Sequence, residues 1–316
     1  MTASSDSLAI ELSAVVVTVK DGTAMVLCRP GAAEAGAETA PYALPSGPFA
    51  PGKHRTFDLA LRAFVHDQTG FDIGYVEQLY SFGDAARGDV ISVGYLALTP
   101  SMDFETRSSA VWVPFHRFFP WEDFLHGYRD GHRDGHRDGE QNGSVKALRP
   151  LLETWAQGPD ADLRLRRIET LFPLEFDHWN EERVLDRYEL LYDAGLVGEA
   201  GYTALASVAG VAMALDHRRI LATGLSRLRG KLKYRPVIFE LMPERFTLLE
   251  LQRSLEALTG LRLHKQNFRR ALERTGFVAP LGEMREDTGG RPAALYRYDR
   301  DQFRFSPSLG LSLPRA

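Results

Sequence analysis

The sequence has almost no cysteine and no long apolar segment. Cys28 is the only cysteine, so an internal disulfide and the Cys/His patterns of structural zinc sites are excluded. Apolar runs such as residues 13–19 are much shorter than the roughly 20 residues that cross a membrane. The first residues also lack the basic and apolar segments of a secretion signal. We therefore expect a cytoplasmic protein with no membrane partner.

The composition is otherwise that of a globular protein. Of the 316 residues, 44% are hydrophobic and 25% are charged, which is close to the average for folded domains and excludes wholesale disorder. At about 150 residues per domain, the length is right for two domains.

The net charge of −4 conceals an asymmetry along the chain. Residues 228–298 contain fourteen Lys and Arg against eight Asp and Glu, a net charge of +6, which leaves −10 for the rest. A basic C-terminal part on an acidic body favours a partner such as nucleic acid, although a solvated surface can have the same charge.

The first third alternates strand and turn signals, with one clear helix. Residues 13–19 and 24–28 are apolar and β-branched runs joined by Asp21-Gly22, the pattern of a β-hairpin. Residues 56–70 predict a helix from the N-cap Thr56 to Gly70. Further strands are expected at 75–82, 90–98 and 110–115, so the order is α/β with a mixed sheet.

The middle of the chain begins with a polar repeat and continues as helices. Residues 127–143 repeat the tetrapeptide GHRD, and the glycines between His132 and His136 favour a solvated loop over a metal site. Helical spacing follows at 145–156, 181–195 and 202–217. Leucines then recur on one face at 221, 225, 228 and 232, a pattern that fits core packing and a dimer contact equally well.

The C-terminal part has the order of a winged helix-turn-helix. Residues 247–260 open with a capping box, Thr247 and Glu250, and end at Gly260. A second helix at 264–276 has an inward face of Phe268, Ala271 and Leu272. Two strands around a glycine-rich tip follow within 277–299 and form the expected wing.

A basic helix of this kind fits the major groove, where Arg and Lys meet guanine or phosphate and Gln or Asn pairs with adenine. A small helical bundle with solvated arginines is the simpler alternative. The expected DNA-contacting residues are Lys265, Gln266, Asn267, Arg269, Arg270 and Arg274 on the helix, and Arg291 at the wing tip.

The N-terminal part resembles the Nudix box, in which glutamates hold the divalent metals that activate a pyrophosphate. The loop 44–52, the helix and residues 68–71 keep the layout of the box, but most of its chemical positions differ. One surviving carboxylate cannot hold a cluster of hard cations, so no metal site is expected. The positions of the box glutamates and its Arg-Glu pair are occupied by Lys53, Ala63, Phe64, Asp67 and Gln68.

Together the two ends resemble the Nudix-related transcriptional regulators of NAD metabolism of the NrtR and NadQ type. The resemblance rests on 44-LPSGPF, 75-YVEQLYSFGDAARGDVISVGYLAL, 247-TLLELQRSLEALTG and 267-NFRRALERTGFV. It implies an α/β/α sandwich with a mixed sheet and a C-terminal winged helix; the helical insertion expected within residues 121–204 makes this segment longer than in the simplest members of the family. It also implies a nucleotide site formed by Arg29, Tyr42, Gly47, Lys53, Arg62, Phe82, Asp84 and Arg87; of these, Tyr42 and Phe82 could also be core aromatics, and Arg62 could pair with a nearby acid.

The resulting hypothesis is a homodimeric repressor of NAD biosynthesis genes with a catalytically inactive Nudix-like sensor. Its partners would be a palindromic double-stranded operator and a nucleotide effector, ADP-ribose, NAD or ATP, with no cofactor required. An ADP-ribose pyrophosphatase that uses acids in place of the missing glutamates, such as Asp67, Asp72, Glu77 and Asp84, is the alternative, and a protein-binding scaffold is a third. The expected parts are residues 1–120 (Nudix-like), 121–204 (loop and helical insertion), 205–235 (linker helix) and 236–316 (winged helix).

Overall fold

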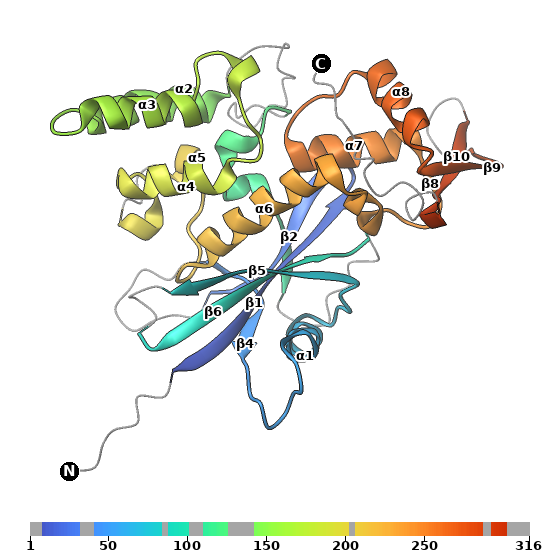
Figure 1. Cartoon of the computed structure of the whole chain (residues 1–316), viewed down its shortest axis with the longest axis horizontal. Helices are drawn as coiled ribbons and strands as arrows, with labels where there is room; N and C mark the ends of the chain where they lie inside the picture. The colour runs from blue at the N-terminus through green and yellow to red at the C-terminus, as the bar shows by residue number, and fades with distance from the viewer. Residues whose placement is uncertain are drawn as a thin grey trace.

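The computed structural model describes residues 8–31, 41–83, 88–100, 110–125, 142–201, 206–286 and 292–301. A mixed β-sheet forms the base of the molecule, a group of helices lies above it, and the winged helix lies at one side (Figure 1). None of the helices within these ranges is long and apolar enough to span a membrane.

Seven strands form the large sheet, in the order β3-β2-β1-β6-β5, with β4 beside β1 and β7 beside β2. β1 and β6 run parallel, whereas β1–β2 and β5–β6 are antiparallel, so the predicted mixed sheet is confirmed. Asp21 and Gly22 both have positive φ in the β1–β2 turn, as the hairpin signal requires. The strands are β1 (Ala9–Lys20), β2 (Thr23–Pro30), β3 (Tyr42–Ala43), β4 (Ser46–Pro48), β5 (Tyr75–Gly83), β6 (Val90–Leu98) and β7 (Val111–Pro114).

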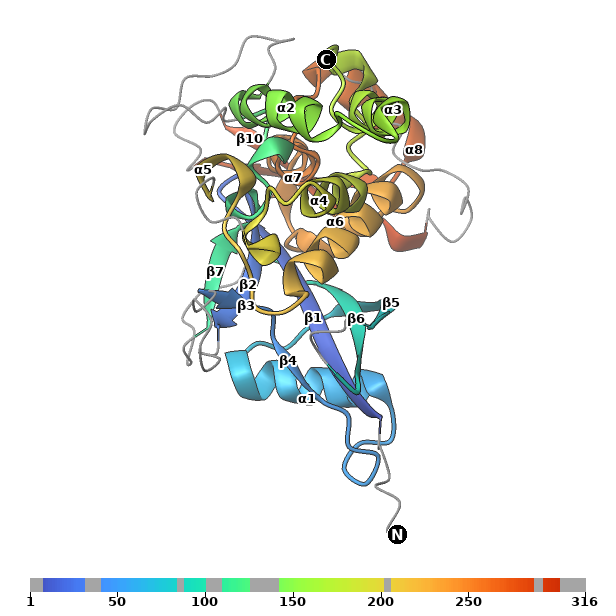
Figure 2. The same ribbon diagram turned by 90° about the vertical axis from the view of Figure 1, so that its left-hand side faces the viewer.

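Helices cover both faces of this sheet. α1 (Phe57–Thr69) begins at the N-cap Thr56 and ends at Gly70, both as predicted. It buries Leu61 and Val65 against one face of β1, while α6 (His217–Tyr234) packs on the opposite face. Figure 2 shows the sheet between these two helices. The α/β/α sandwich that the resemblance implied is confirmed, and the middle of β1 is buried on both faces, as expected for a strand between two layers of helices.

The helical insertion contains α2 (Gly143–Trp155), α3 (Ala161–Leu171) and α4 (Val184–Asp193), and the short α5 (Ala206–Ala209) follows it. The predicted helix over 202–217 is therefore wrong over residues 210–216, and His217 begins the next helix. Gly210 has a left-handed φ of 74° and lies against the carbonyl of Phe118, where a Cβ would collide, so the chain leaves the helical path there. The GHRD repeat lies outside the described residues.

α6 connects the sandwich to the rest of the chain. Leu221, Leu225, Leu228 and Leu232 are all at most 1% exposed, so the leucine repeat is core packing within one chain. The helix approaches β1 closely at Gly224, where a Cβ would lie 3.0 Å from Val15. Glycine at this position lets the helix backbone pack directly on the sheet.

The C-terminal part has the helix and strand order of a winged helix. α7 (Leu248–Thr259) begins with the predicted capping box and ends at Gly260, and α8 (Lys265–Thr275) follows after a short turn. The wing consists of β9 (Val278–Arg285) and β10 (Ala293–Tyr298), and β8 (Phe246–Thr247) pairs with β10. α7 docks on the β1–β2 hairpin, which fixes the winged helix against the sandwich.

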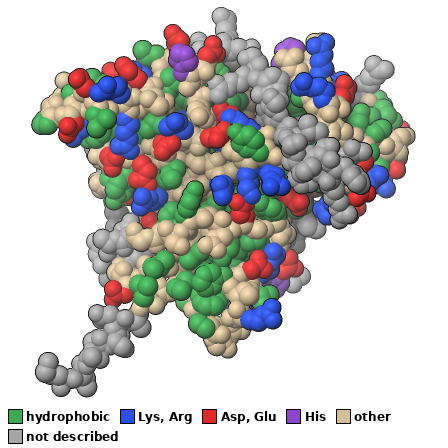
Figure 3. Space-filling view, viewed as in Figure 1, with side chains coloured by type: hydrophobic (Ala, Val, Ile, Leu, Met, Phe, Trp, Pro, Cys, Tyr) green, Lys and Arg blue, Asp and Glu red, His purple; other side chains and the backbone are tan. Residues whose placement is uncertain are grey.

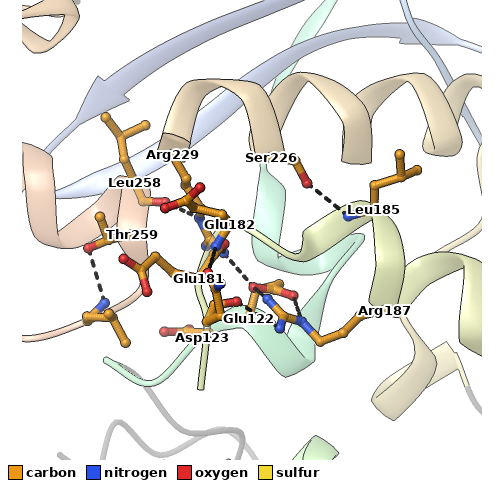
Figure 4. A network of polar contacts seen from close by, with 12 residues as sticks. Glu122, Asp123, Glu181, Glu182, Leu185, Arg187, Ser226, Arg229, Leu258 and Thr259 are labelled. Carbon is orange, nitrogen blue, oxygen red and sulfur yellow. Dashed lines mark hydrogen bonds and ion pairs between the residues drawn. The ribbon is translucent and has the colours of Figure 1, made fainter. Parts of the chain in front are cut away.

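A buried carboxylate joins these parts (Figure 4). Glu122 follows the sheet in the short 3-10 helix Pro120–Glu122 and is 1% exposed. Arg187 of α4 donates two hydrogen bonds to it, at 2.6 and 3.0 Å, and Arg229 of α6 forms a further ion pair. Arg229 also donates to the carbonyl of Leu258 in α7, at 2.8 Å. One charge network thus links the sheet, the insertion, the linker helix and the winged helix.

Burial alone would raise the pKa of Glu122, but the guanidinium groups of Arg187 and Arg229 outweigh this effect and lower it below the usual carboxyl range. The carboxylate is therefore charged at neutral pH. Its contribution to stability is fully present above the ordinary carboxyl pKa and is lost as the pH falls through the lowered pKa of the folded state.

The first prediction concerns Glu122→Gln. The substitution leaves two buried guanidinium groups without their carboxylate, so we expect the free energy of unfolding to fall by about 3 to 5 kcal/mol. Urea denaturation at pH 7 measures this loss. The matched control is Asp193→Asn, which removes the exposed ion pair of Asp193 with Arg167 and should cost less than about 1 kcal/mol. Equal losses in the two variants would contradict a central role for Glu122.

Candidate functional site

The exposed face of α8 is basic. Its inward residues Phe268, Ala271 and Leu272 are buried, as predicted. Figure 3 shows Lys and Arg side chains on the surface at the end of the molecule where α8 lies. The four cations on this helix form no ion pair with any other residue in the described ranges, and the predicted contact residues Lys265, Gln266, Arg269, Arg270 and Arg274 are exposed, with Asn267 half-buried.

Side chains of α7 hold the turn before α8 in place. Glu256 accepts a hydrogen bond from the Leu263 N–H at 2.9 Å, and Gln252 donates to the Leu263 carbonyl at 3.0 Å. Both backbone groups of one turn residue are thus satisfied by the same helix. This arrangement fixes the angle at which α8 leaves α7, and with it the direction of the basic face.

The wing is joined to the same scaffold. Arg285 of β9 forms an ion pair with Glu250 of α7, and Arg245 pairs with Glu283 at 2.7 Å. These arginines are engaged within the domain, in contrast to those of α8. Arg291, the predicted wing-tip contact, lies outside the described residues.

On the sandwich, Arg29 is bonded to the loop between β3 and β4. Its guanidinium donates to the Leu44 carbonyl at 3.1 Å and to the Ser46 hydroxyl at 3.0 Å. Gly47 follows directly, and a Cβ there would lie 3.3 Å from the ring of Phe64 in α1. The predicted nucleotide loop is therefore held between a β2 arginine and α1.

Arg62 also bonds to the backbone. It forms an ion pair with Asp58 at 3.0 Å and donates to the carbonyls of Ile73 and Gly74. This geometry matches the alternative of a pairing with a nearby acid, and it fixes the turn between α1 and β5. Lys53 is exposed in the loop before α1.

The two predicted aromatic contacts lie on the other side of the sheet. Tyr42 packs edge-on against Phe118, with ring centroids 5.5 Å apart, and accepts a hydrogen bond from Arg117 at 3.1 Å. Phe82 is 8% exposed within the core beneath α6, which fits the core alternative. The structure thus groups Arg29, Gly47 and Arg62 toward α1 and separates Tyr42 and Phe82 from them; Asp84 and Arg87 lie outside the described residues.

Gln68 has a role that the sequence did not indicate. Its amide nitrogen donates to the Ser46 carbonyl at 2.6 Å, and its amide oxygen accepts from the Ser46 N–H at 3.2 Å. A glutamate, the residue of the Nudix box, could accept the second bond but could not donate the first while ionised. Among the described residues, no group of three or more His, Cys, Asp and Glu side chains is arranged to hold a metal.

A second contact missed by the sequence joins the loop to the linker helix. The Leu44 N–H donates to the Nδ1 atom of His217 at 3.1 Å, and His217 is the first residue of α6. The two residues are 173 positions apart, so no local pattern could reveal the pair. The loop after β3 is therefore bonded directly to the helix whose far half contacts the winged helix.

Comparison with known proteins agrees with this architecture. Residues 238–298 match the model of the NrtR DNA-binding winged helix domain. The ADPR responsive transcriptional repressor NtrR of Acinetobacter baylyi is 36% identical over 103 residues; the match covers 33% of this chain and 41% of that relative, so it spans about two fifths of the relative's length.

Two solved structures share the fold. Shewanella oneidensis NrtR in complex with a 27mer DNA has a TM-score of 0.56 at 19% identity, covering 96% of this chain and 98% of that one. A MutT/nudix family protein from Enterococcus faecalis has a TM-score of 0.51 at 16% identity, covering 93% and 87%. The resemblance found in the sequence is confirmed: the chain unites a Nudix-type fold with an NrtR-type winged helix domain.

The second prediction tests the role of Gln68. In Gln68→Glu a carboxylate faces the Ser46 carbonyl, so we expect the free energy of unfolding to fall by about 1 to 3 kcal/mol. Gln78→Glu is the matched control, because among the described residues the Gln78 side chain only accepts a hydrogen bond, from the Tyr95 hydroxyl at 3.4 Å, which a carboxylate also does. Equal denaturation midpoints for the two variants would refute the role assigned to the amide.

Proposed function

We propose that this chain, in which an NrtR-type winged helix follows a Nudix-like domain, is a DNA-binding transcriptional repressor controlled by a nucleotide. The observation that carries the proposal is the exposed basic face of α8, positioned by α7 within residues 238–298. A helix of this kind enters the major groove and combines phosphate contacts with base contacts.

The proposed base-reading and phosphate-binding residues are Lys265, Gln266, Asn267, Arg269, Arg270 and Arg274, with Arg291 at the wing. The proposed operator is a palindrome bound by a homodimer, because two-fold symmetry of the protein requires two equivalent half-sites. The NAD biosynthesis genes are the proposed targets.

The Nudix-like domain serves as the nucleotide sensor in this proposal. The name of the curated Acinetobacter relative includes a response to ADPR, so ADP-ribose is the first candidate effector, followed by NAD and ATP. Its site comprises Arg29, Tyr42, Gly47, Lys53, Arg62, Phe82, Asp84 and Arg87. Arg29 and Arg62 already donate hydrogen bonds to backbone carbonyls. The ligand phosphates would therefore bind to the remaining donors of these guanidinium groups.

We propose that the domain does not act as a hydrolase and needs no cofactor. The positions of the box glutamates are occupied by Lys53, Asp67 and Gln68, and Gln68 is committed to Ser46. A hard divalent cation is held by oxygen ligands, chiefly carboxylates, and a lysine at one of these positions repels it.

The route from sensor to DNA follows α6. One end of this helix bonds the β3–β4 loop through His217, and its other half holds α7 through Arg229 and Leu258. A nucleotide changes DNA affinity only by binding the DNA-competent and incompetent arrangements differently, and couplings of this kind amount to about 1 to 3 kcal/mol.

The third prediction tests the whole proposal. Fluorescence anisotropy near 150 mM salt measures binding of the chain to promoter fragments of its own gene and of NAD biosynthesis genes, with and without ADP-ribose, NAD or ATP. We expect tight binding to at least one fragment and a shift of about 5- to 150-fold with one nucleotide. Equal weak binding to every fragment would refute the repressor, and AMP release from ADP-ribose with Mg²⁺, abolished in Asp67→Asn, would favour the hydrolase.

The fourth prediction concerns the reader helix. Arg269→Ala and Arg270→Ala should each weaken operator binding and reduce the salt slope by about one unit if the lost contact is to phosphate. Arg166→Ala, on the exposed side of α3, is the matched control and should change neither quantity. Binding of both α8 variants at the wild-type level would exclude this helix as the DNA reader.

A further inference from the structure

A cleft lies between the sandwich and the winged helix, on a different part of the chain from the β3–β4 loop. Its volume is about 1040 Å³, at the upper end of the range for small-molecule pockets. One wall comes from the ends of β1, β5 and β6, including Lys20 and Tyr75. The other comes from the segment before β8 and from β9 and β10, including Arg297, Tyr298 and Arg300.

Positive charge predominates in this lining. Four Lys and Arg residues face two acids, Glu240 and Glu244. Arg245 is engaged with Glu283, but within the described ranges Arg297 and Arg300 form no ion pair, and both are exposed. Guanidinium groups with their donors available are the preferred protein partners of phosphate oxygens.

Aromatic rings complete the lining. Tyr298 and Phe239 stack in parallel, with centroids 4.2 Å apart and planes 8° from each other, and Tyr75 lies on the opposite wall. Tyr75 is itself fixed by hydrogen bonds to Glu77 at 2.5 Å and from Lys231 at 3.0 Å. Phe239 is buried and supports Tyr298, whereas Tyr298 and Tyr75 are half-buried; rings held in this way beside cations suit a ligand that combines a planar ring with phosphate groups.

The cleft also touches the sensor side. Gly74 lines it, and the carbonyl of Gly74 accepts a hydrogen bond from Arg62 of α1 at 3.1 Å. On the other wall, Phe246 and Arg297 belong to the small sheet of the winged helix. A ligand in the cleft would contact both domains at once, so its binding free energy would depend on how they are oriented.

We propose that this cleft is a second nucleotide site, separate from the one on the Nudix-like face, with Arg297 and Arg300 as phosphate-binding residues. A nucleotide bound there fixes the winged helix against the sandwich. The inference does not rest on the proposed repressor function, because nucleotide binding to the cleft is measured without DNA.

The fifth prediction is tested by isothermal titration calorimetry of the full chain with ADP-ribose. We expect the double variant Arg297→Ala/Arg300→Ala to lose one equivalent of bound ADP-ribose, or to bind it at least tenfold more weakly, at concentrations that saturate the wild type. Both residues are exposed, so the variant should fold. Arg166→Ala is again the matched control and should bind like the wild type.

Two results would overturn the inference: unchanged stoichiometry and affinity of ADP-ribose in the double variant, and no ADP-ribose binding by the wild type. If the double variant with unchanged nucleotide binding also binds DNA more weakly, the arginines are assigned to the DNA interface. The repressor proposal fails separately, if no promoter fragment is bound specifically in the anisotropy assay.

Discussion

The arrangement of the chain depends on the ion pairs of the buried Glu122 carboxylate. A buried charge is tolerated only when opposite charges and hydrogen bonds replace its water, and here these come from Arg187 and Arg229 on two different helices. Arg229 meets three segments at once, because it also donates to the carbonyls of Leu258 and Glu181. Moving either helix would remove one of the two ion pairs that compensate the buried charge of Glu122.

This constraint makes α6 the mechanical link of the molecule. Its 18 residues span about 27 Å at 1.5 Å per residue. His217 bonds the β3–β4 loop at one end, Gly224 packs on β1 in the middle, and Arg229 holds α7 beyond it. A displacement of the β3–β4 loop would therefore act on α6 directly, and α6 also contacts the winged helix. Coupling between distant sites requires an element whose arrangement both sites bias, and α6 is in contact with both the loop and the winged helix.

Sequence reasoning predicted the features that depend on neighbouring residues. The Asp21-Gly22 turn, the α1 caps Thr56 and Gly70, and the α7 capping box all come from local chemistry, and each was confirmed. The inward face of α8 followed from helical spacing. Prediction from the sequence failed where the interacting partner is distant in the chain. Gly210 ends a helix because the carbonyl of Phe118 lies against it. Arg229 is buried because it pairs with Glu122, which is 107 positions away.

The arginines of the sandwich show why a site is harder to predict than a fold. A guanidinium group binds phosphate and backbone carbonyls through the same donors, so the sequence alone does not separate the two roles. Arg29 and Arg62 hold carbonyls of Leu44, Ile73 and Gly74, whereas the arginines of α8 and of the interdomain cleft have no such bonds within the described residues. A guanidinium group that already donates to backbone carbonyls contributes less binding free energy to a ligand than one that gives up only water when it binds phosphate. The guanidinium groups without bonds to other described residues are therefore where ligand affinity should concentrate, on α8 for DNA and at Arg297 and Arg300 for a nucleotide.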